Sequence, residues 1–248
     1  MSNEDEQKIA NEKIALLITQ RIRELRAKPV DETFDISHLK EIHRRIFQDC
    51  PGLPYPEAQI YKPGEFRSPV PGGLYWRKKR PLKSTVNISE IYYSSMDTEN
   101  VKRLETILKN ISIEKALKLP EDEFKLEMGV LYAKIDQIHP FHDGNSRTLR
   151  EFTSQLAQKA KYEIEWSRFD SEAGHELLYI ARDLSVNKIT LECLTDEKER
   201  EVMQRKIALF EKYPDMPALM FAVVRKLEEP EQEKNNADGQ GNETGGTV

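Results

Sequence analysis

An amphipathic helical pattern that stops at a proline constrains the fold of this chain more than any other feature. Five apolar residues follow one another at spacings of four, three, four and three positions: Phe124, Met128, Leu131, Ile135 and Ile138. This spacing places all five on one face of an α-helix, which predicts that the face is buried in a core. Pro140 disfavours helical backbone at the residue before it, so we expect the helix to end near His139.

Similar helical patterns recur along most of the chain. They lie at residues 4–27, 34–49, 100–113, 147–161, 175–184, 197–213 and 216–227. Asp35 is expected to cap the second of these helices. No regular helix is expected in residues 50–82, which hold seven of the 13 prolines and four of the 11 glycines. Residues 84–93 are rich in β-branched and aromatic side chains, which is typical of a strand or half of a hairpin. Together the patterns predict an all-α fold with a core of six to eight helices and one small β-hairpin.

The composition excludes several classes of protein. The chain has 248 residues with 38 Lys and Arg against 43 Asp and Glu, and the net charge of −5 argues against a basic nucleic-acid-binding face. No apolar run reaches the ~18 residues that a membrane-spanning helix needs. The acidic, polar beginning does not resemble a secretory signal, and the two cysteines, Cys50 and Cys193, form no spacing pattern. We therefore expect a cytoplasmic protein with no membrane contact and no direct contact with nucleic acid.

The patterns divide the chain into four parts. Residues 1–30 are expected to form an N-terminal helix, 31–200 the main domain and 201–228 a helical extension. Residues 229–248 contain no aromatic residue and only Val248 as a branched aliphatic residue. Such a segment cannot bury enough apolar surface to fold, so we expect a disordered tail.

The loop between two strong helical patterns, residues 139–147, carries the residues with chemical function. It reads His-Pro-Phe-His-Asp-Gly-Asn-Ser-Arg. Asn145 or Ser146 can cap the helix that follows, and Thr148 and Glu151 have the spacing of a capping box. Free backbone N–H groups at a helix start, together with the helix dipole, form a binding site for an anion.

The charged residues of this segment indicate the nature of that anion. Arg147 and Arg150 lie three positions apart on one face of the helix, near the N-terminus, where arginine opposes the helix dipole unless it binds an anion. Asp143 would be repelled by a bare phosphate, but it can hold a hard cation such as Mg²⁺ beside one. His139 can accept a proton near neutral pH. This combination predicts a site for phosphate transfer.

The twelve positions His139–Arg150 resemble the signature of the Fic family, HPFx(D/E)GNGRxxR. Residues 34–49, FDISHLKEIHRRIFQD, are similar to the helix that opens Fic cores, and Gly64–Arg67 is similar to the GExR sequence that follows it. The fixed spacing of several unusual residue types makes the resemblance specific. It implies a Fic-type helical core in residues 31–200. It also implies a protein adenylyltransferase, which transfers AMP from ATP to a Ser, Thr or Tyr hydroxyl of a target protein in the presence of Mg²⁺.

The resemblance implies a role for each residue in the first half of the motif. His139 would be the general base that takes the proton of the target hydroxyl, and Phe141 would anchor the loop in the core. Asp143 would hold Mg²⁺ between the α and β phosphates of ATP. A β-hairpin flap would cover the site and align the target segment by strand pairing, and residues 76–93 are the candidate for it.

The second half of the motif is implied to bind the phosphates. Gly144, Asn145 and Ser146 would surround them, while Arg147 and Arg150 would bind the β and γ phosphates and stabilise the departing pyrophosphate. Ser146 departs from the family pattern, which has glycine at this position. The departure leaves open a Fic-fold phosphotransferase or a transferase of another nucleotide. A catalytically silent nucleotide-binding module is the third alternative.

Residues 95–100 match a pattern that inhibits members of the family, (S/T)xxxE(G/N), in which the glutamate pairs with the second motif arginine. Here that pair would be Glu99 with Arg150. The segment follows the flap instead of lying on a terminal helix, and Ser95 and Asp97 are good caps for the helix after it. We therefore prefer capping as the role of this segment. Inhibition is then absent, or a small antitoxin-like partner protein supplies it, as in toxin–antitoxin members of the family.

Other polar residues near the motif receive structural interpretations. His43 lies among the apolar residues of its helix and is expected to pack near the site. The basic cluster WRKKR at residues 76–80 is expected to be a solvated strand end, and no function is predicted for His175.

Overall fold

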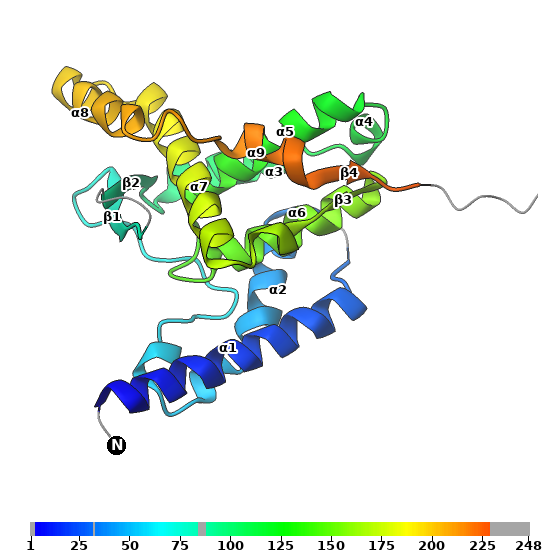
Figure 1. Cartoon of the computed structure of the whole chain (residues 1–248), viewed down its shortest axis with the longest axis vertical. Helices are drawn as coiled ribbons and strands as arrows, with labels where there is room; N and C mark the ends of the chain where they lie inside the picture. Colours follow the sequence, from blue (N-terminus) through cyan, green and yellow to red (C-terminus); the bar gives the residue numbers. More distant parts are fainter. Residues whose placement is uncertain (1–2, 32, 84–87, 229–248) are drawn as a thin grey trace, which may run out of the picture.

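The computed structural model of the chain describes residues 3–31, 33–83 and 88–228. Its elements, in chain order, are α1 (Asn3–Ala27), α2 (Ile36–Phe47), two 3-10 helices (Cys50–Gly52 and Pro56–Ala58), β1 (Tyr75–Pro81), β2 (Ile88–Ser94), α3 (Thr98–Lys109), α4 (Ile113–Ala116), α5 (Glu121–Ile138), α6 (Asn145–Lys159), β3 (Tyr162–Ile164), a third 3-10 helix (Trp166–Phe169), α7 (Glu172–Cys193), α8 (Glu197–Ala208), α9 (Met216–Val223) and β4 (Val224–Lys226) (Figure 1). The described part is mainly helical with a small hairpin, which confirms the predicted fold class. Residues 84–87 of the predicted strand and the predicted tail at 229–248 lie outside the described residues.

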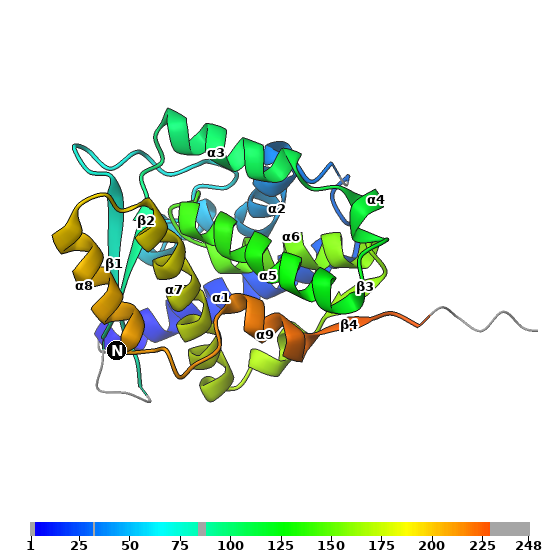
Figure 2. The same ribbon diagram turned by 90° about the horizontal axis from the view of Figure 1, so that it is seen from above.

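Helix α5 is the central element. It contacts α3, α6, α7 and α9, and Figure 2 shows it in the middle of the molecule. Of the five apolar residues that predict this helix, Leu131 is partly buried and the other four are buried. The helix ends where Pro140 predicts, because His139 adopts a left-handed backbone with a φ of 51°.

Helices α1 and α2 pack against each other on one side of the body (Figure 1). The predicted cap of α2 is present, since the Asp35 carboxylate accepts a hydrogen bond of 2.9 Å from the His38 N–H. Leu39, Ile42 and Ile46 of α2 are at most 1% exposed, so this helix joins the main core.

The two small sheets lie at different places in the fold. β1 and β2 form an antiparallel hairpin at the position predicted for the flap, and β2 packs against α7. β3 and β4 form a second antiparallel pair that the sequence analysis does not predict. The predicted helix over 216–227 is wrong beyond Val223, because Val224–Lys226 leave the helix to pair with Tyr162–Ile164.

No helix among the described residues is both long enough and apolar enough to cross a lipid bilayer. The bounds expected for the four parts of the chain stay predictions.

We predict that Gly129→Ala lowers the free energy of unfolding by about 1–2 kcal/mol, although alanine is the better helix former. A Cβ atom on Gly129 of α5 would lie 2.4 Å from the Cα of Pro217 in α9, and backbone cannot move aside cheaply. Urea denaturation measures the change. Gly52→Ala is the control, because a Cβ there meets nothing within 4 Å. A stabilised Gly129→Ala variant would contradict the close approach of α5 and α9.

Candidate active site

A buried arginine shapes the loop that follows α5. The guanidinium of Arg67 donates from Nε to the carbonyl of His139 at 2.7 Å and from Nη2 to the carbonyl of Ile138 at 3.1 Å. Nη2 also donates to the carbonyl of Ser94, at the end of β2. These bonds satisfy carbonyl groups at the C-terminus of α5. Arg67, the last residue of the GExR-like sequence, therefore joins the helix end, the loop and the hairpin.

The His139 side chain is held in one orientation by a buried ion pair. Its Nδ1 lies 3.2 Å from Oδ1 of Asp136, one turn earlier in α5. Asp136 also accepts two hydrogen bonds from Arg182 of α7, at 2.9 and 2.8 Å. A carboxylate only accepts hydrogen bonds, so Nδ1 carries the proton of the neutral ring and the lone pair stays on Nε2. Tyr93 of β2 stacks on the ring with centroids 3.8 Å apart.

Burial lowers the pKa of His139 to about 4, although the neighbouring carboxylate of Asp136 acts in the opposite direction. The positive charges of Arg182 and Lys78 also lower this pKa. Arg182 holds the pKa of Asp136 well below its usual range, so the carboxylate stays charged, and burial of the His139 ring outweighs its effect on the pKa of that ring. His139 is therefore neutral at pH 7, which is the form that a general base requires.

The turn into α6 depends on Gly144. Its φ of 78° is left-handed, and a Cβ atom there would lie 2.3 Å from the ring of Phe47. Asn145 is the first residue of α6, and its side chain accepts from the N–H of Phe141 at 2.9 Å and donates to the carbonyl of Phe141 at 2.7 Å. Phe141 itself is buried, which fits its predicted role as the anchor of the loop.

The predicted caps of this helix are wrong. The N-cap is Gly144 and no side chain caps it, because the Asn145 amide is already used within the loop. Thr148 and Glu151 lie further inside the helix, and Glu151 forms two hydrogen bonds with Arg26 of α1, at 2.9 and 2.6 Å. The first N–H groups of α6 therefore keep their capacity to bind an anion.

The charged residues of the motif surround this helix start. The Asp143 carboxylate is about one third exposed and accepts from the Gly144 N–H and from Arg147 at 3.1 Å. Arg147 also donates to the Tyr61 hydroxyl at 2.9 Å. Arg150 has no ion-pair partner within the described residues. His43 packs beside the loop as expected, since its Nε2 donates to the carbonyl of Asp143 at 3.1 Å.

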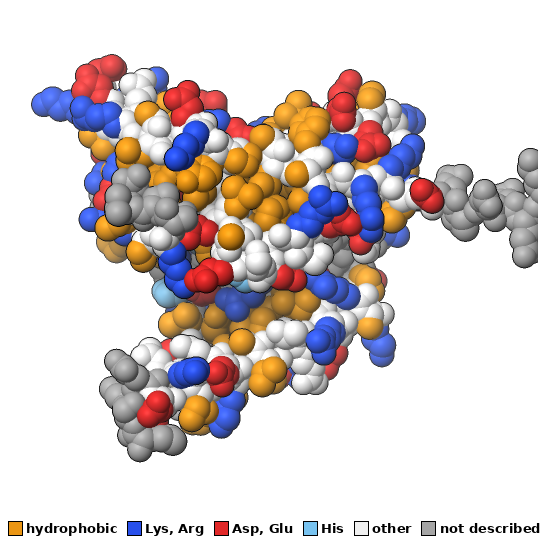
Figure 3. Space-filling model, in the orientation of Figure 1, with side chains coloured by type: hydrophobic (Ala, Val, Ile, Leu, Met, Phe, Trp, Pro, Cys, Tyr) orange, Lys and Arg blue, Asp and Glu red, His pale blue; other side chains and the backbone are white. Residues whose placement is uncertain are grey.

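One cavity of about 540 Å³ brings the predicted site residues together: His139, Asp143, Gly144, Asn145, Ser146, Arg147 and Arg150 all line it. Figure 3 shows that basic and histidine side chains gather in the hollow between α1 and the body of the molecule. The cavity is strongly basic, which suits an anionic ligand.

Five further residues line the same cavity, and no pattern in the sequence places them there: Lys78, Arg80, His175, Tyr179 and Arg182. The expectation that residues 76–80 form a solvated strand end is wrong for Lys78 and Arg80, because alternate side chains of β1 face the cavity. The sequence does contain an indication of a role for Arg182, because Arg182 and Asp183 interrupt an otherwise apolar stretch of helix.

Glu99 is not brought to the site. It is exposed in the first turn of α3, and no ion pair joins it to Arg150 among the residues described. Asp97 caps α3 by accepting from the Asn100 N–H at 2.9 Å, while the Ser95 hydroxyl accepts from the Val70 N–H. The capping interpretation holds for Asp97, and Ser95 serves the preceding loop instead.

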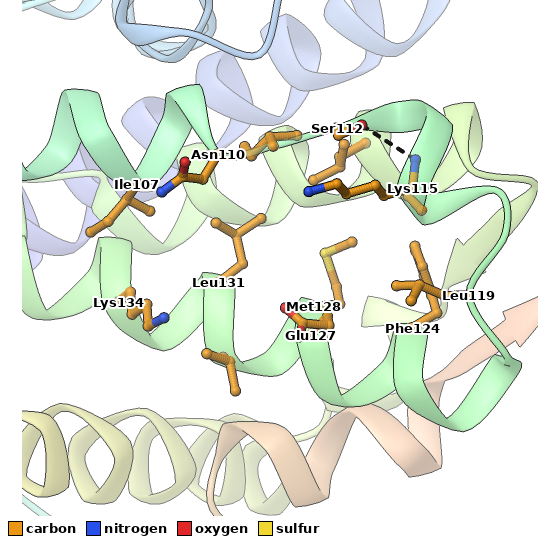
Figure 4. Close-up of a pocket in the computed structure, with 14 residues that line it drawn as sticks. Ile107, Asn110, Ser112, Lys115, Leu119, Phe124, Glu127, Met128, Leu131 and Lys134 are labelled. Atoms are coloured by element: carbon orange, nitrogen blue, oxygen red, sulfur yellow. Dashed lines mark hydrogen bonds between the residues drawn. The ribbon is translucent and has the colours of Figure 1, made fainter.

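A second pocket, of about 370 Å³, lies between α3, α4 and α5 (Figure 4). Its lining is mostly apolar and includes Leu131, Met128 and Phe124, and Lys115 and Lys134 also line it (Figure 4). It shares no lining residue with the cavity of the motif. The chemistry predicted from the sequence therefore belongs to the basic cavity.

Comparison with known proteins agrees with this geometry. The sequence model of the Fic/DOC family matches residues 33–157, about half of the chain. The chain belongs to the Fic/DOC family. Among solved structures of Fic domains, it is similar to the N-terminal Fic domain of a VirB-translocated Bep effector from Bartonella quintana, with ADP bound (19% identity, 89% of this chain and 87% of that chain, TM-score 0.58). It is also similar to BepC from Bartonella tribocorum, with AMPPNP bound (18% identity, 89% of each chain, TM-score 0.57).

Two curated relatives are named protein adenylyltransferases. VbhT of Bartonella schoenbuchensis is 28% identical over 152 residues, and a protein of Bartonella henselae is 26% identical over 148 residues. Each match covers 60% of this chain but only 26% of the relative's length. This chain therefore spans about a quarter of the length of these relatives.

We predict that Asp136→Asn lowers the free energy of unfolding by about 3–5 kcal/mol, because Arg182 is left as a buried and unpaired charge. Urea denaturation measures this loss. Glu105→Gln is the matched control, since Glu105 pairs with Lys109 on the exposed surface and its loss costs less than about 1 kcal/mol. Equal stability of the two variants would show that the Asp136–Arg182 pair does not hold α5 to α7.

Proposed function

We propose that this chain is a protein adenylyltransferase that transfers AMP from ATP to a hydroxyl group of a target protein. The observation that carries the proposal is a neutral, oriented histidine beside an uncapped helix start and two arginines in one cavity. The names of the two curated relatives and the nucleotides bound in two similar Fic structures support it.

In the proposed reaction, Nε2 of His139 takes the proton of the target hydroxyl, whose oxygen then bonds to the α-phosphorus of ATP while the bond to pyrophosphate breaks. The first N–H groups of α6, together with Arg147 and Arg150, bind the phosphates and neutralise the charge on pyrophosphate. Asn145 acts indirectly, since its amide holds the loop through Phe141.

Asp143 would hold Mg²⁺, and the residues present fit this ion. Mg²⁺ is often bound through one or two carboxylates plus substrate phosphates, and Asp143 supplies one partly exposed carboxylate at the helix start. No cluster of three or more acidic, cysteine or histidine residues suited to a metal occurs among the residues described, so the phosphates would complete the site. When bound, Mg²⁺ neutralises phosphate charge and orients the phosphate chain.

Ser146 does not require a strained backbone. It is the second residue of α6 and its φ is not positive, so glycine is not needed there for conformation. Ser146 lies beside the buried Tyr132 hydroxyl. Burial raises the pKa of Tyr132, and the neighbouring Ser146 hydroxyl lowers it. These observations favour AMP transfer over a changed reaction, and the phosphotransferase alternative is decided by the labelling experiment below.

The proposal extends to the partners and location of the chain. The target would offer a Ser, Thr or Tyr hydroxyl. Because Glu99 does not reach Arg150, inhibition would come from a small antitoxin-like protein, if it occurs. Cys50 and Cys193 are free thiols, which is compatible with a cytoplasmic location.

We predict that ATP labelled at the α-phosphate, incubated with a bacterial lysate and Mg²⁺, labels a protein band, whereas ATP labelled at the γ-phosphate does not. His139→Ala should reduce labelling at least about 100-fold, because the general base is removed. His43→Gln is the control for disturbance of nearby packing. A band labelled from the γ-phosphate would establish phosphotransfer instead. ATP binding without any labelled product would favour the silent module.

We predict a nearly constant rate of labelling between about pH 5.5 and about pH 8. This range includes the ~6.5 at which an ordinary histidine titrates, but it lies above the lowered pKa of His139, about 4. The neutral ring is the base, so activity is lost only as the pH approaches 4. A rate that falls by half near pH 6.5 would contradict this.

Folding must be checked in the same range. A histidine with a lowered pKa binds fewer protons in the folded protein than in the unfolded chain, so the free energy of unfolding decreases as the pH falls from 6.5 towards 4. Circular dichroism at each pH separates this loss from loss of the base.

A further inference from the structure

The side chains of β1 divide between two surfaces. Trp76, Lys78 and Arg80 are partly buried, whereas Arg77 and Lys79 between them are exposed. The Trp76 ring lies 5.4 Å from the His139 ring, and Lys78 and Arg80 line the basic cavity. β1 therefore places an aromatic residue beside the catalytic histidine and two cations further along the same face.

Lys78 differs from its basic neighbours in its partners. Arg77 pairs with Glu199 at 2.9 Å, Lys79 with Glu90 at 3.2 Å and Arg80 with Asp183 at 3.4 Å. Within the described residues, no carboxylate lies within ion-pair distance of Lys78. Burial lowers the pKa of Lys78. The Lys78 ammonium lies 5.9 Å from the centre of the Trp76 ring, a contact that supplies no negative charge. A half-buried cation without a carboxylate partner is unfavourable in the free protein, and a ligand that brings a negative charge relieves this cost.

The hairpin offers one free edge. The outer edge of β2 is occupied by α7, because the Asn187 side chain bonds the N–H of Tyr92 and the carbonyl of Glu90, and Thr190 donates to the carbonyl of Tyr92 at 2.7 Å. In the described part of the chain β1 pairs only with β2, and Figure 2 shows β1 on the side of β2 away from α7. An extended segment can therefore add to β1.

We infer that the target segment bound along β1 carries an Asp or Glu two residues from the modified hydroxyl, where it meets Lys78. The inference rests on the proposed function and adds the substrate class to it. A residue paired with Trp76 points its side chain to the same face of the sheet, towards His139. The next side chain on that face is two residues away, opposite Lys78. It follows the hydroxyl if the segment runs parallel to β1 and precedes it if the segment is antiparallel.

Nucleotide phosphate is the competing partner for Lys78. The start of α6, Arg147 and Arg150 already form the proposed phosphate site, and they belong to α6, whereas Lys78 belongs to β1. Lys78 is on the element that would align the target, so we assign it to the target.

Short peptides with a central Ser, Thr or Tyr test the inference. They carry Asp, Ala or Lys two positions before or two positions after the hydroxyl, and they are incubated with ATP labelled at the α-phosphate. Asp at one of the two positions should raise kcat/KM about tenfold over Lys. Lys78→Glu should reverse this preference. Lys79→Glu, a charge reversal on the exposed face of the same strand, should keep it.

Two outcomes would overturn the inference: no preference at either position, or a Lys78→Glu variant that raises the KM for ATP and keeps the preference for acidic peptides.

If no peptide and no lysate protein is labelled, the proposed function fails separately. Peptide binding to the His139→Ala protein, followed by NMR chemical shifts, then still decides the inference. Asp peptides should bind about tenfold more tightly than Lys peptides, and equal binding would contradict it.

Discussion

The buried pair between Asp136 and Arg182 is the interaction on which the geometry of the proposed active site depends. It joins the central helix α5 to α7, and the same carboxylate holds Nδ1 of His139. A buried ion pair adds little net stability compared with apolar packing, but breaking one partner leaves a costly charge. The pair therefore fixes the positions of α5, α7 and His139 relative to one another, and it adds little net stability to the fold. It sets the tautomer of the histidine, and Arg182 also opposes part of the rise in the pKa of His139 that the carboxylate causes.

The sequence predicts those parts of the structure that local patterns encode. The spacing from Phe124 to Ile138 places α5 and its buried face, and Pro140 places its end. The motif identifies the loop of the proposed active site because its residues are contiguous. Asp136, Lys78 and Arg182 are missed because they come from three separate elements, and their meeting depends on tertiary packing. The caps of α6 are predicted wrongly for a related reason. The Asn145 amide could bond either the N–H groups at the start of α6 or the backbone of the loop. It bonds the N–H and the carbonyl of Phe141, so it does not cap the helix.

Several contacts join the β1–β2 hairpin to the loop that follows α5. Arg67 bonds the end of α5, the carbonyl of His139 and the end of β2, while Tyr93 of β2 stacks on the histidine. Packing of β2 on α7 adds a second attachment. These contacts hold the hairpin at a fixed distance from His139, the proposed base, without a bound substrate. In the proposed function, recognition of the target would then depend on what fits the edge of β1 and on its charge.

The two positions where the family motif has glycine differ in what they require. At position 144 the ring of Phe47 occupies the space that a Cβ atom would need, and the backbone is left-handed. At position 146 the backbone is helical, and serine is accommodated beside Tyr132. The shape of the loop therefore requires glycine at position 144, whereas the helical backbone at position 146 also accepts serine. A search pattern that insists on both glycines would pass over sequences like this one, even though their loops can close in the same way.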